Sequence, residues 1–318
     1  MQFPADVASA VEDAASAFPF RDLARAAAGI SERYRGDRPR TGRLTPLECA
    51  AWAAVRMPAT FAATHAVISE LLRRAPEVRI ESVLDLGAGT GAGVRAASEL
   101  LPLGYATAME QDAALRALGA RLASGARWLE RDIRIGPPFP VHDLVLLGWV
   151  AGELDSPARE HVLDRAWQAA QRALIIIEPG TTRGFEIVRS ARRQLLAAGA
   201  FLAAPCPAAD ECAAPDGEWC HFAARVERSA LHRRLKAGEL SYEDEKYCYL
   251  IATRAPAARA EQRVVRHPRH EPGLIRLQLC NGDVWQTHEI RKRDKIRFRR
   301  ARKAQWGDEW VENQESRI

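Results

Sequence analysis

The sequence has 318 residues, of which 47% are hydrophobic and 27% charged, and its formal net charge is +5. This composition is typical of a soluble globular protein, and the length allows two domains or one domain with appendages. No run of 18 apolar residues occurs, which excludes a membrane-spanning helix. Acidic residues near the N-terminus fit neither a signal peptide nor a transit peptide, so we expect a cytoplasmic protein without membrane contact, as a monomer.

Residues 1–78 are predicted to form a helical N-terminal region. They contain alanine-rich stretches whose apolar residues recur at helical spacing, and Pro58 and Pro76 interrupt this pattern. The predicted helical stretches are 6–30, 46–56 and 59–74.

Residues 79–254 are predicted to form an α/β domain with a doubly wound, mostly parallel sheet. Short apolar runs alternate there with amphipathic segments, which is the pattern of strands joined by crossover helices. Between the last helix and the last strand, residues 203–220 are rich in Pro, Ala, Asp and Cys and are predicted to be a loop insertion. The predicted strands are 79–86, 106–110, 127–131, 144–148, 173–178 and 243–254, and the predicted helices are 91–101, 112–123, 156–171 and 183–199.

A glycine-rich turn follows the first predicted strand. In Val83-Leu-Asp-Leu-Gly-Ala-Gly-Thr-Gly91, the residues Gly87, Gly89 and Gly91 would let the backbone approach a ligand closely at the start of a helix. The pattern also nearly matches a dinucleotide-binding fingerprint, with Ala92 in place of the third glycine. The glycines alone therefore indicate a nucleotide-type ligand without identifying it.

Three acidic residues narrow the choice of ligand. Asp85 at the end of the strand would repel a pyrophosphate but suits a cationic sulfonium ligand with a free amino group. Glu110 follows the next strand, where it could accept both ribose hydroxyls, and Asp132 follows the third strand, beside the expected adenine amino group. The series resembles the class I S-adenosylmethionine-dependent methyltransferases over 79–254. That resemblance implies a seven-stranded sheet ending in an antiparallel hairpin; the alternative is a nucleotide fold that has kept no ligand.

The sequence does not predict which atom would accept a methyl group. The fourth strand leads into Leu147-Gly-Trp-Val-Ala-Gly-Glu153, which lacks the Asn/Asp-Pro-Pro-Tyr element that handles exocyclic amines. The fifth strand ends without a cysteine for covalent attack on a pyrimidine. Glu153 and Glu178 could each move a proton or cap a helix.

Three cysteines are spaced as Cys206-x5-Cys212-x7-Cys220, and Cys280 lies 60 residues further on. Clustered thiols in a chain without a secretory signal are more often metal ligands than disulfides. Structural zinc sites usually place two ligands on one tight turn, whereas a cubane binds its thiolates at separate corners. The wide spacing therefore favours iron–sulfur over zinc, with zinc and ordinary buried thiols as the alternatives.

The segments around these cysteines resemble the mitochondrial small-ribosomal-subunit assembly methyltransferase-like family and its bacterial relatives, from about residue 40 onward. The resemblance implies a [4Fe–4S] cluster on Cys206, Cys212 and Cys220, closed by Cys280 from the C-terminal region. It excludes Cys248 as a ligand, because that strand position is usually not a cysteine in the family. The matching segments are 56–60 (Arg-Met-Pro-Ala-Thr), 205–212, 216–222, 225–229 and 242–246.

The family resemblance also implies a function. We expect an S-adenosylmethionine-dependent methyltransferase-like protein that acts on the small ribosomal subunit or its rRNA during assembly. The first alternative is an assembly factor that keeps the donor fold but transfers no methyl group. A radical enzyme is disfavoured, because the Cys-x3-Cys-x2-Cys loop that leaves one iron open is absent from the sequence.

Positive charge is concentrated near the C-terminus. Residues 255–318 contain 15 Lys and Arg against 9 Asp and Glu, a net charge of +6, and most of the excess lies in 291–303. Interleaved Ile296, Phe298 and Trp306 favour a folded element over a disordered arm. We therefore predict a small basic C-terminal unit of β character over 255–318, divided from the sheet by 266–273, which contacts rRNA through 291–303. The alternative is an ordinary solvated surface.

Overall fold

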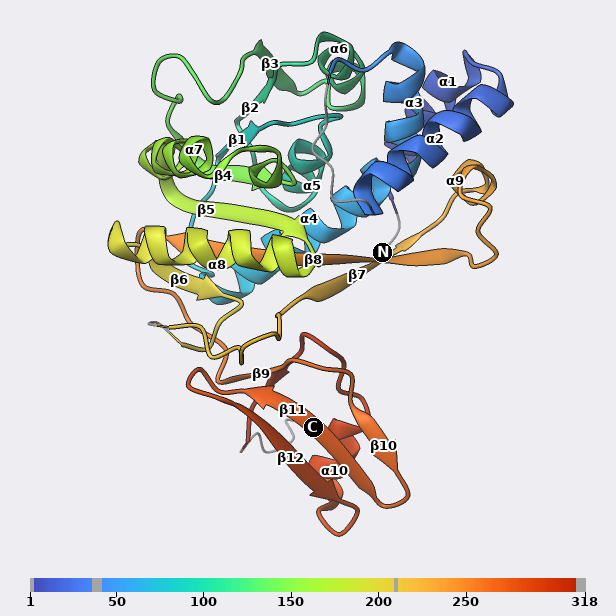
Figure 1. The fold of residues 1–318 in the computed structure, drawn as a ribbon. Coiled ribbons are helices and arrows are strands. Elements are labelled where there is room, and N and C mark those ends of the chain that lie inside the picture. The colour runs from blue at the N-terminus through green and yellow to red at the C-terminus, as the bar shows by residue number, and fades with distance from the viewer. Residues whose placement is uncertain (1–2, 36–41, 209–210, 313–318) are drawn as a thin grey trace.

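The computed structural model describes residues 3–35, 42–208 and 211–312. Its main sheet has the strand order β3-β2-β1-β4-β5-β8-β6, with β7 also paired to β8 (Figure 1). Strands β1 to β5 are parallel, and β8 is antiparallel to β5, β6 and β7. This mixed, doubly wound sheet with an antiparallel end is the predicted methyltransferase-type fold. The strands are β1 (Ser82–Leu86), β2 (Tyr105–Glu110), β3 (Ala126–Glu130), β4 (His142–Gly148), β5 (Ala170–Pro179), β6 (Phe201–Ala204), β7 (Phe222–Glu227) and β8 (Tyr242–Thr253).

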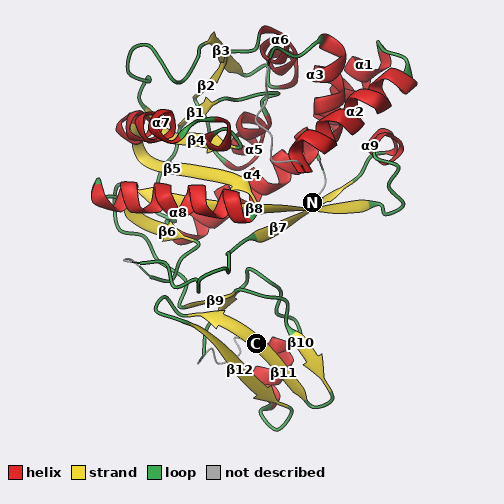
Figure 2. Ribbon diagram, in the orientation of Figure 1, coloured by secondary structure: helices red, strands yellow, loops and turns green. Residues whose placement is uncertain are grey.

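Helices cover both faces of this sheet (Figure 2). Alternate residues of a strand therefore enter different cores: Val83 packs with the N-terminal helices, whereas Leu84 packs with α7 and α8. Burial on both faces explains why all five residues of β1 are buried. The helices are α1 (Ala5–Ser16), α2 (Phe20–Arg35), α3 (Pro46–Val55), α4 (Met57–Arg74), α5 (Ala92–Leu100), α6 (Ala113–Leu122), the 3₁₀ turn η1 (Ala151–Glu153), α7 (Ser156–Ala169), α8 (Thr182–Ala197), α9 (Ala230–Leu235) and α10 (Lys295–Ala301).

The N-terminal helices are held against the carboxyl ends of the parallel strands. Helix α3 begins at a capping box in which Thr45 and Glu48 bond each other's backbone N–H. Just before it, the Leu44 N–H donates to Asp112, which also caps α6. At the junction of α3 and α4, Arg56 forms a bidentate ion pair with Glu245 of β8. These contacts place α3 and α4 over the strand ends where a ligand site was predicted.

The cysteine-rich segment interrupts the edge of the sheet. Both β6 and β7 pair antiparallel with β8, so they act as two pieces of one edge strand separated by residues 205–221. The prediction of a loop over 203–220 therefore needs a correction, because 203–204 belong to β6. Strand β7 and helix α9 were not predicted. In β7 (Phe-Ala-Ala-Arg-Val-Glu) buried and exposed residues alternate, but the surrounding polar sequence obscures this alternation.

The C-terminal residues form a second, five-stranded sheet with its own small core of apolar side chains. The predicted β character of this region is correct, but 266–273 is not simply a divider, because it contains β10. In Figure 1 this sheet lies beside the edge of the main sheet that carries the cysteine segment. Its strands are β9 (Gln262–Val264), β10 (Arg269–Glu271), β11 (Leu274–Cys280), β12 (Trp285–Arg291) and β13 (Glu309–Trp310). Among the described residues, no helix combines the length and apolarity needed to cross a membrane.

Candidate functional site

A cleft opens at the carboxyl ends of β1, β2 and β4, with about 920 Å³ of free space that is partly open to solvent. In doubly wound sheets this edge is where ligands bind. Four of the predicted residues line the cleft, namely Asp85, Gly87, Gly89 and Glu110. Helices α3 and α4 add Trp52, Thr60 and Thr64, which sequence analysis missed. The spacing of four residues places both threonines on one face of α4, but nothing in the sequence shows which surface that face meets.

The glycine turn adopts the conformation that the motif predicts. Gly87, Gly89 and Gly91 have φ angles of +71°, +56° and +84°, in the left-handed region that side chains rarely occupy. A Cβ on Gly87 would lie 2.7 Å from Val150 Cγ2, and one on Gly91 would lie 2.8 Å from the Ala123 Cβ. Glycine is therefore required for the close packing of this turn at the start of α5.

Asp85 is the charged centre of the cleft. Its residue is 5% exposed, and it accepts a hydrogen bond from the Val94 N–H in the first turn of α5. Burial raises the pKa of Asp85 to about 7, and the neighbouring Glu110 carboxylate adds to this rise. Gly93, which sequence analysis missed, makes room for it, since a Cβ there would lie 2.4 Å from Asp85 Oδ2. A cationic group placed beside Asp85 would favour its ionised form.

Glu110 is held in place by the backbone. Its Oε2 accepts from the Gly89 N–H and its Oε1 from the Asp112 N–H, both at 2.9 Å. These bonds fix the carboxylate against the glycine turn at the end of β2. A carboxylate can accept more than one hydrogen bond at each oxygen.

The structure places Asp132 apart from the other predicted residues. It lines a polar pocket that adjoins the cleft, and Glu153 and Arg131 lie in both spaces. The Asp132 carboxylate pairs with Arg134, whose Nη2 lies 2.6 Å from Oδ2, and this bond lowers the pKa of Asp132. The predicted contact with an adenine amino group stays a prediction, because Asp132 lines the space next to the cleft and not the cleft itself.

Glu178 and Glu153 lie in different settings. Glu178 is 1% exposed and accepts from the Ala151 N–H at 3.0 Å and from the Gly152 N–H, so it caps η1 and does not line the cleft. Burial raises its pKa to about 8. Glu153 at the end of η1 does line the cleft. Of the two proposed roles, capping applies to Glu178.

The four predicted cysteine ligands line one cavity with about 650 Å³ of free space, between α8, β8, β11 and the segment after β6. All of them are free thiols. Cys248 lines the same cavity, and its Sγ donates to the Cys220 carbonyl at 3.1 Å. The four ligands are Cys206, Cys212, Cys220 and Cys280. In the part of the chain that the structure describes, no group of three or more His, Cys, Asp or Glu residues could hold a metal ion.

Burial, with repulsion from neighbouring thiols, raises the pKa of three of these cysteines, Cys206, Cys220 and Cys280. Burial raises the pKa of Cys206 to about 11 and that of Cys220 well above its usual value. Two nearly buried arginines, Arg192 and Arg263, line the cavity and offset negative charge on the sulfurs. The cavity thus brings the four predicted ligand thiols and two cationic side chains together, although the described residues form no group that could hold a metal ion.

The basic segment 291–303 forms the end of β12, a turn and helix α10. Arg291 at the end of β12 pairs with Glu289 at 3.2 Å. Two arginines of α10 are also used within the fold: Arg297 pairs with Glu312 at 2.7 Å, and Arg300 donates to the Val311 carbonyl at 2.8 Å and lies over the Trp310 ring. The remaining basic residues of the turn and helix are exposed. These are Lys292, Arg293, Lys295, Arg299, Arg302 and Lys303.

The chain is similar to several known proteins. The human "Ribosome assembly protein METTL17, mitochondrial" is 24% identical over 286 residues, which cover 80% of this chain and 60% of that protein. The chain therefore spans less than two thirds of this relative. Among solved structures, magnesium protoporphyrin IX methyltransferase from Synechocystis PCC 6803 matches with a TM-score of 0.42 at 12% identity, covering 71% of this chain and 94% of that one.

A second solved structure, the N-methyltransferase NodS from Bradyrhizobium japonicum WM9, matches with a TM-score of 0.40 at 11% identity, covering 60% of this chain and 96% of that one. The family model described as "Mitochondrial small ribosomal subunit Rsm22" matches residues 46–311, most of the chain. This range includes the glycine turn, the four predicted cysteine ligands and the basic helix. The chain therefore belongs to the mitochondrial small ribosomal subunit Rsm22 family.

Proposed function

We propose that this protein binds S-adenosylmethionine in the Asp85 cleft and acts on the small ribosomal subunit or its rRNA during assembly as a methyltransferase. The observation that carries the proposal is the buried Asp85 beside a left-handed glycine turn at the carboxyl edge of a methyltransferase-type sheet. A buried carboxylate with a raised pKa is suited to a cationic ligand, since pairing offsets its desolvation.

The residues of the cleft have distinct roles in this proposal. Asp85 would pair with the donor's amino group, and the glycine turn would let the backbone contact the ligand at the start of α5. Glu110, already oriented by the Gly89 and Asp112 N–H groups, would accept the ribose hydroxyls. Glu153 faces both the cleft and the adjoining polar pocket, which makes it the candidate to position the acceptor.

The four-cysteine cavity is proposed to hold a [4Fe–4S] cluster on Cys206, Cys212, Cys220 and Cys280. Three observations support this: the four thiols face one cavity, none is in a disulfide, and two buried arginines line its wall. With four thiolate ligands such a cluster would serve as a structural cross-link between the two sheets. Zinc remains the alternative metal.

The exposed basic residues of 291–303 are the proposed rRNA contact. This assignment excludes Arg297 and Arg300, because both are engaged within the fold. Contact with the small subunit also agrees with the family's description and with the relative named a ribosome assembly protein.

An assembly factor without catalysis is the second candidate, favoured by the position of Glu178, which caps η1 instead of reaching the cleft. A single assay separates the two: purified protein, radiolabelled S-adenosylmethionine and small subunits from a strain that lacks the protein. Donor-dependent label in the rRNA supports methyl transfer. Donor binding without label supports the non-catalytic factor, and absence of donor binding contradicts both uses of the cleft.

A further inference from the structure

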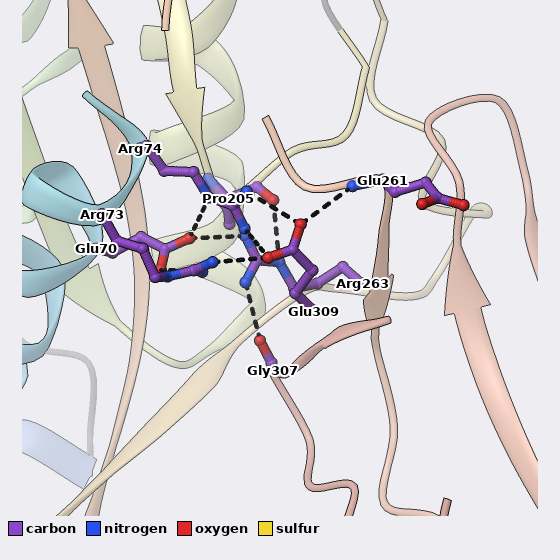
Figure 3. Close-up of polar contacts among 8 residues, drawn as sticks. All are labelled: Glu70, Arg73, Arg74, Pro205, Glu261, Arg263, Gly307 and Glu309. Atoms are coloured by element: carbon purple, nitrogen blue, oxygen red, sulfur yellow. Dashed lines mark hydrogen bonds and ion pairs between the residues drawn. The ribbon is translucent and has the colours of Figure 1, made fainter. Parts of the chain in front are cut away.

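Five charged side chains meet where α4 approaches the C-terminal sheet (Figure 3). Glu70, Arg73 and Arg74 come from the last turns of α4, Arg263 from β9 and Glu309 from β13. We call this set the α4 ion network. The side chains of Arg74 and Arg263 are only 5% and 4% exposed, whereas that of Arg73 is 48% exposed. The network is therefore buried on the side that faces the sheets and open at the Arg73 side.

Arg263 joins three separate parts of the chain. Its Nη2 donates to Glu70 Oε1 at 3.0 Å, its Nε to the Pro205 carbonyl at 3.2 Å and its Nη1 to the Gly307 carbonyl at 3.1 Å. A planar guanidinium can make these three bonds at once in a fixed geometry, which a lysine cannot. One side chain thus connects α4, the residue before Cys206, and the turn that leads into β13.

The same arginine is tied to the fourth cysteine by strand pairing. Arg263 is the register partner of Cys280 on β11 and of Glu309 on β13. Glu309 in turn accepts from Arg74 Nη2 at 2.8 Å and from Arg73 Nη1 at 2.6 Å. Any displacement of β9 from α4 would therefore carry Cys280 away from Cys206.

The charges of the network persist over a wide pH range. Burial alone would raise the pKa of Glu70, but Arg263 and the two α4 arginines outweigh it and lower the pKa to about 2. Glu70 is thus ionised at neutral pH, and the contact between α4 and β9 needs no metal ion.

We infer that Arg263 is the positioning residue of the four-cysteine site: it docks the C-terminal sheet on α4 and brings Cys280 to Cys206 before any metal binds. The role of Arg263 in positioning metal ligands rests on the proposed cluster, whereas its role in docking the C-terminal sheet on α4 does not. The metal centre would then close a site that the α4 ion network has already assembled.

Two thiols report on docking in the metal-free full-length protein. Cys280 lies in the C-terminal sheet and is 9% exposed, and Cys49 lies in α3 and is 2% exposed. We expect iodoacetamide labelling, followed by mass spectrometry, to be slow at both in the wild type. In Arg263→Gln, labelling of Cys280 should rise at least about tenfold through local opening, while Cys49 stays protected.

Matched variants separate position from charge. Arg73→Gln also removes a guanidinium from the network, but this side chain contacts neither Pro205 nor Gly307. Labelling of Cys280 in this variant should therefore match the wild type. Arg263→Lys keeps the charge without the three-bond geometry and should give intermediate labelling. In anaerobic preparations, Arg263→Gln should lose most of the iron–sulfur absorbance although all four cysteines remain, and its affinity for the donor should be unchanged.

Glu70→Gln breaks the same Arg263 pair with little change of shape and guards against a folding defect in the arginine variant. The inference is overturned if neither variant shows increased labelling of Cys280. It is also overturned if both variants show increased labelling of Cys49. Rapid labelling of Cys280 in the metal-free wild type also overturns it, since the metal would then hold the sheet. A wild type without iron whose Cys280 still responds to Arg263→Gln would refute the cluster and leave the docking intact.

Discussion

Asp85 shows how one buried side chain can determine ligand preference. Its surroundings disfavour charge, so its pKa rises from an ordinary value of 3.8 to about 7. Without a ligand this raised pKa costs stability as the pH rises from about 4 towards 7, because the unfolded chain ionises in this range while the folded carboxyl stays protonated. A cationic ligand reverses that cost. The residue therefore opposes a pyrophosphate and favours a donor with an amino group.

We predict that affinity for S-adenosylmethionine rises with pH up to about 7 and falls roughly tenfold per unit below it, because Asp85 must ionise to pair with the donor. Asp85→Asn should weaken binding by more than about tenfold and abolish this pH dependence. Calorimetric titration over a pH series measures both effects. Glu178→Gln also neutralises a buried carboxylate, but one that does not line the cleft, and should leave binding nearly unchanged; equal losses in both variants would contradict the assigned ligand site.

At the scale of elements, the split edge strand explains where a metal centre can be inserted. Residues 205–221 leave the sheet after β6 and return as β7, and both strands remain paired with β8. The sheet thus fixes both ends of the cysteine segment, while β11 presents Cys280 from the other side. An interruption of an edge strand costs little pairing, because only one neighbouring strand is affected.

Cys206, Cys212, Cys220 and Cys280 should each be required for iron, measured with acid-labile sulfide in anaerobic preparations, whereas Cys49→Ser should keep full iron. The sharpest control is Cys248→Ser, because Cys248 lines the same cavity but uses its thiol to bond the Cys220 carbonyl. We expect it to retain iron. Loss of iron in Cys248→Ser as complete as in Cys212→Ser would make Cys248 a ligand.

Helix α10 separates two kinds of arginine. Reversal of the exposed residues Arg299, Arg302 and Lys303 to Glu should weaken binding to all small-subunit rRNA fragments alike. It should also reduce the log–log salt slope by about 2 to 3, since each phosphate contact contributes roughly 0.7 to 0.9. Anisotropy titrations across a salt series measure this slope.

The matched control for α10 is Arg297→Gln with Arg300→Gln, which breaks contacts to Glu312 and Val311. This pair should lower the melting temperature and leave the salt slope nearly unchanged. If the exposed triple variant bound as tightly as wild type at low salt, the helix would be an ordinary solvated surface.

For the whole molecule, the α4 ion network links the helical region to the C-terminal sheet. Because the folded pKa of Glu70 is lowered to about 2, its stabilisation is fully present above pH 4.5 and is lost as the pH falls towards 2. The shift corresponds to a contribution on the order of 3 kcal/mol. We predict that Glu70→Gln removes this part of the acid dependence in circular dichroism unfolding, so that the stabilities of variant and wild type converge near pH 2. A constant difference down to pH 2 would contradict the ionised network.

The sequence alone determined the features that depend on neighbours along the chain. Apolar periodicity predicted most strands and helices of the main sheet but missed β7 and α9, and the glycine motif after β1, the cysteine spacing and the basic run were visible directly. Their elements agree with the structure to within a few residues, because local burial on one or both faces leaves its period in the sequence.

Only the tertiary structure decided which distant residues meet. The pairing of Glu70 with Arg263 joins positions 193 residues apart, and the register of β9 with β11 sets Arg263 beside Cys280. Likewise, α4 covers the cleft, Arg297 pairs with Glu312, and Asp132 lines a polar space that adjoins the Asp85 cleft. The hydrophobic periodicity of the sequence carries no information on these contacts, because packing between elements depends on how their faces fit in space and not on their spacing along the chain.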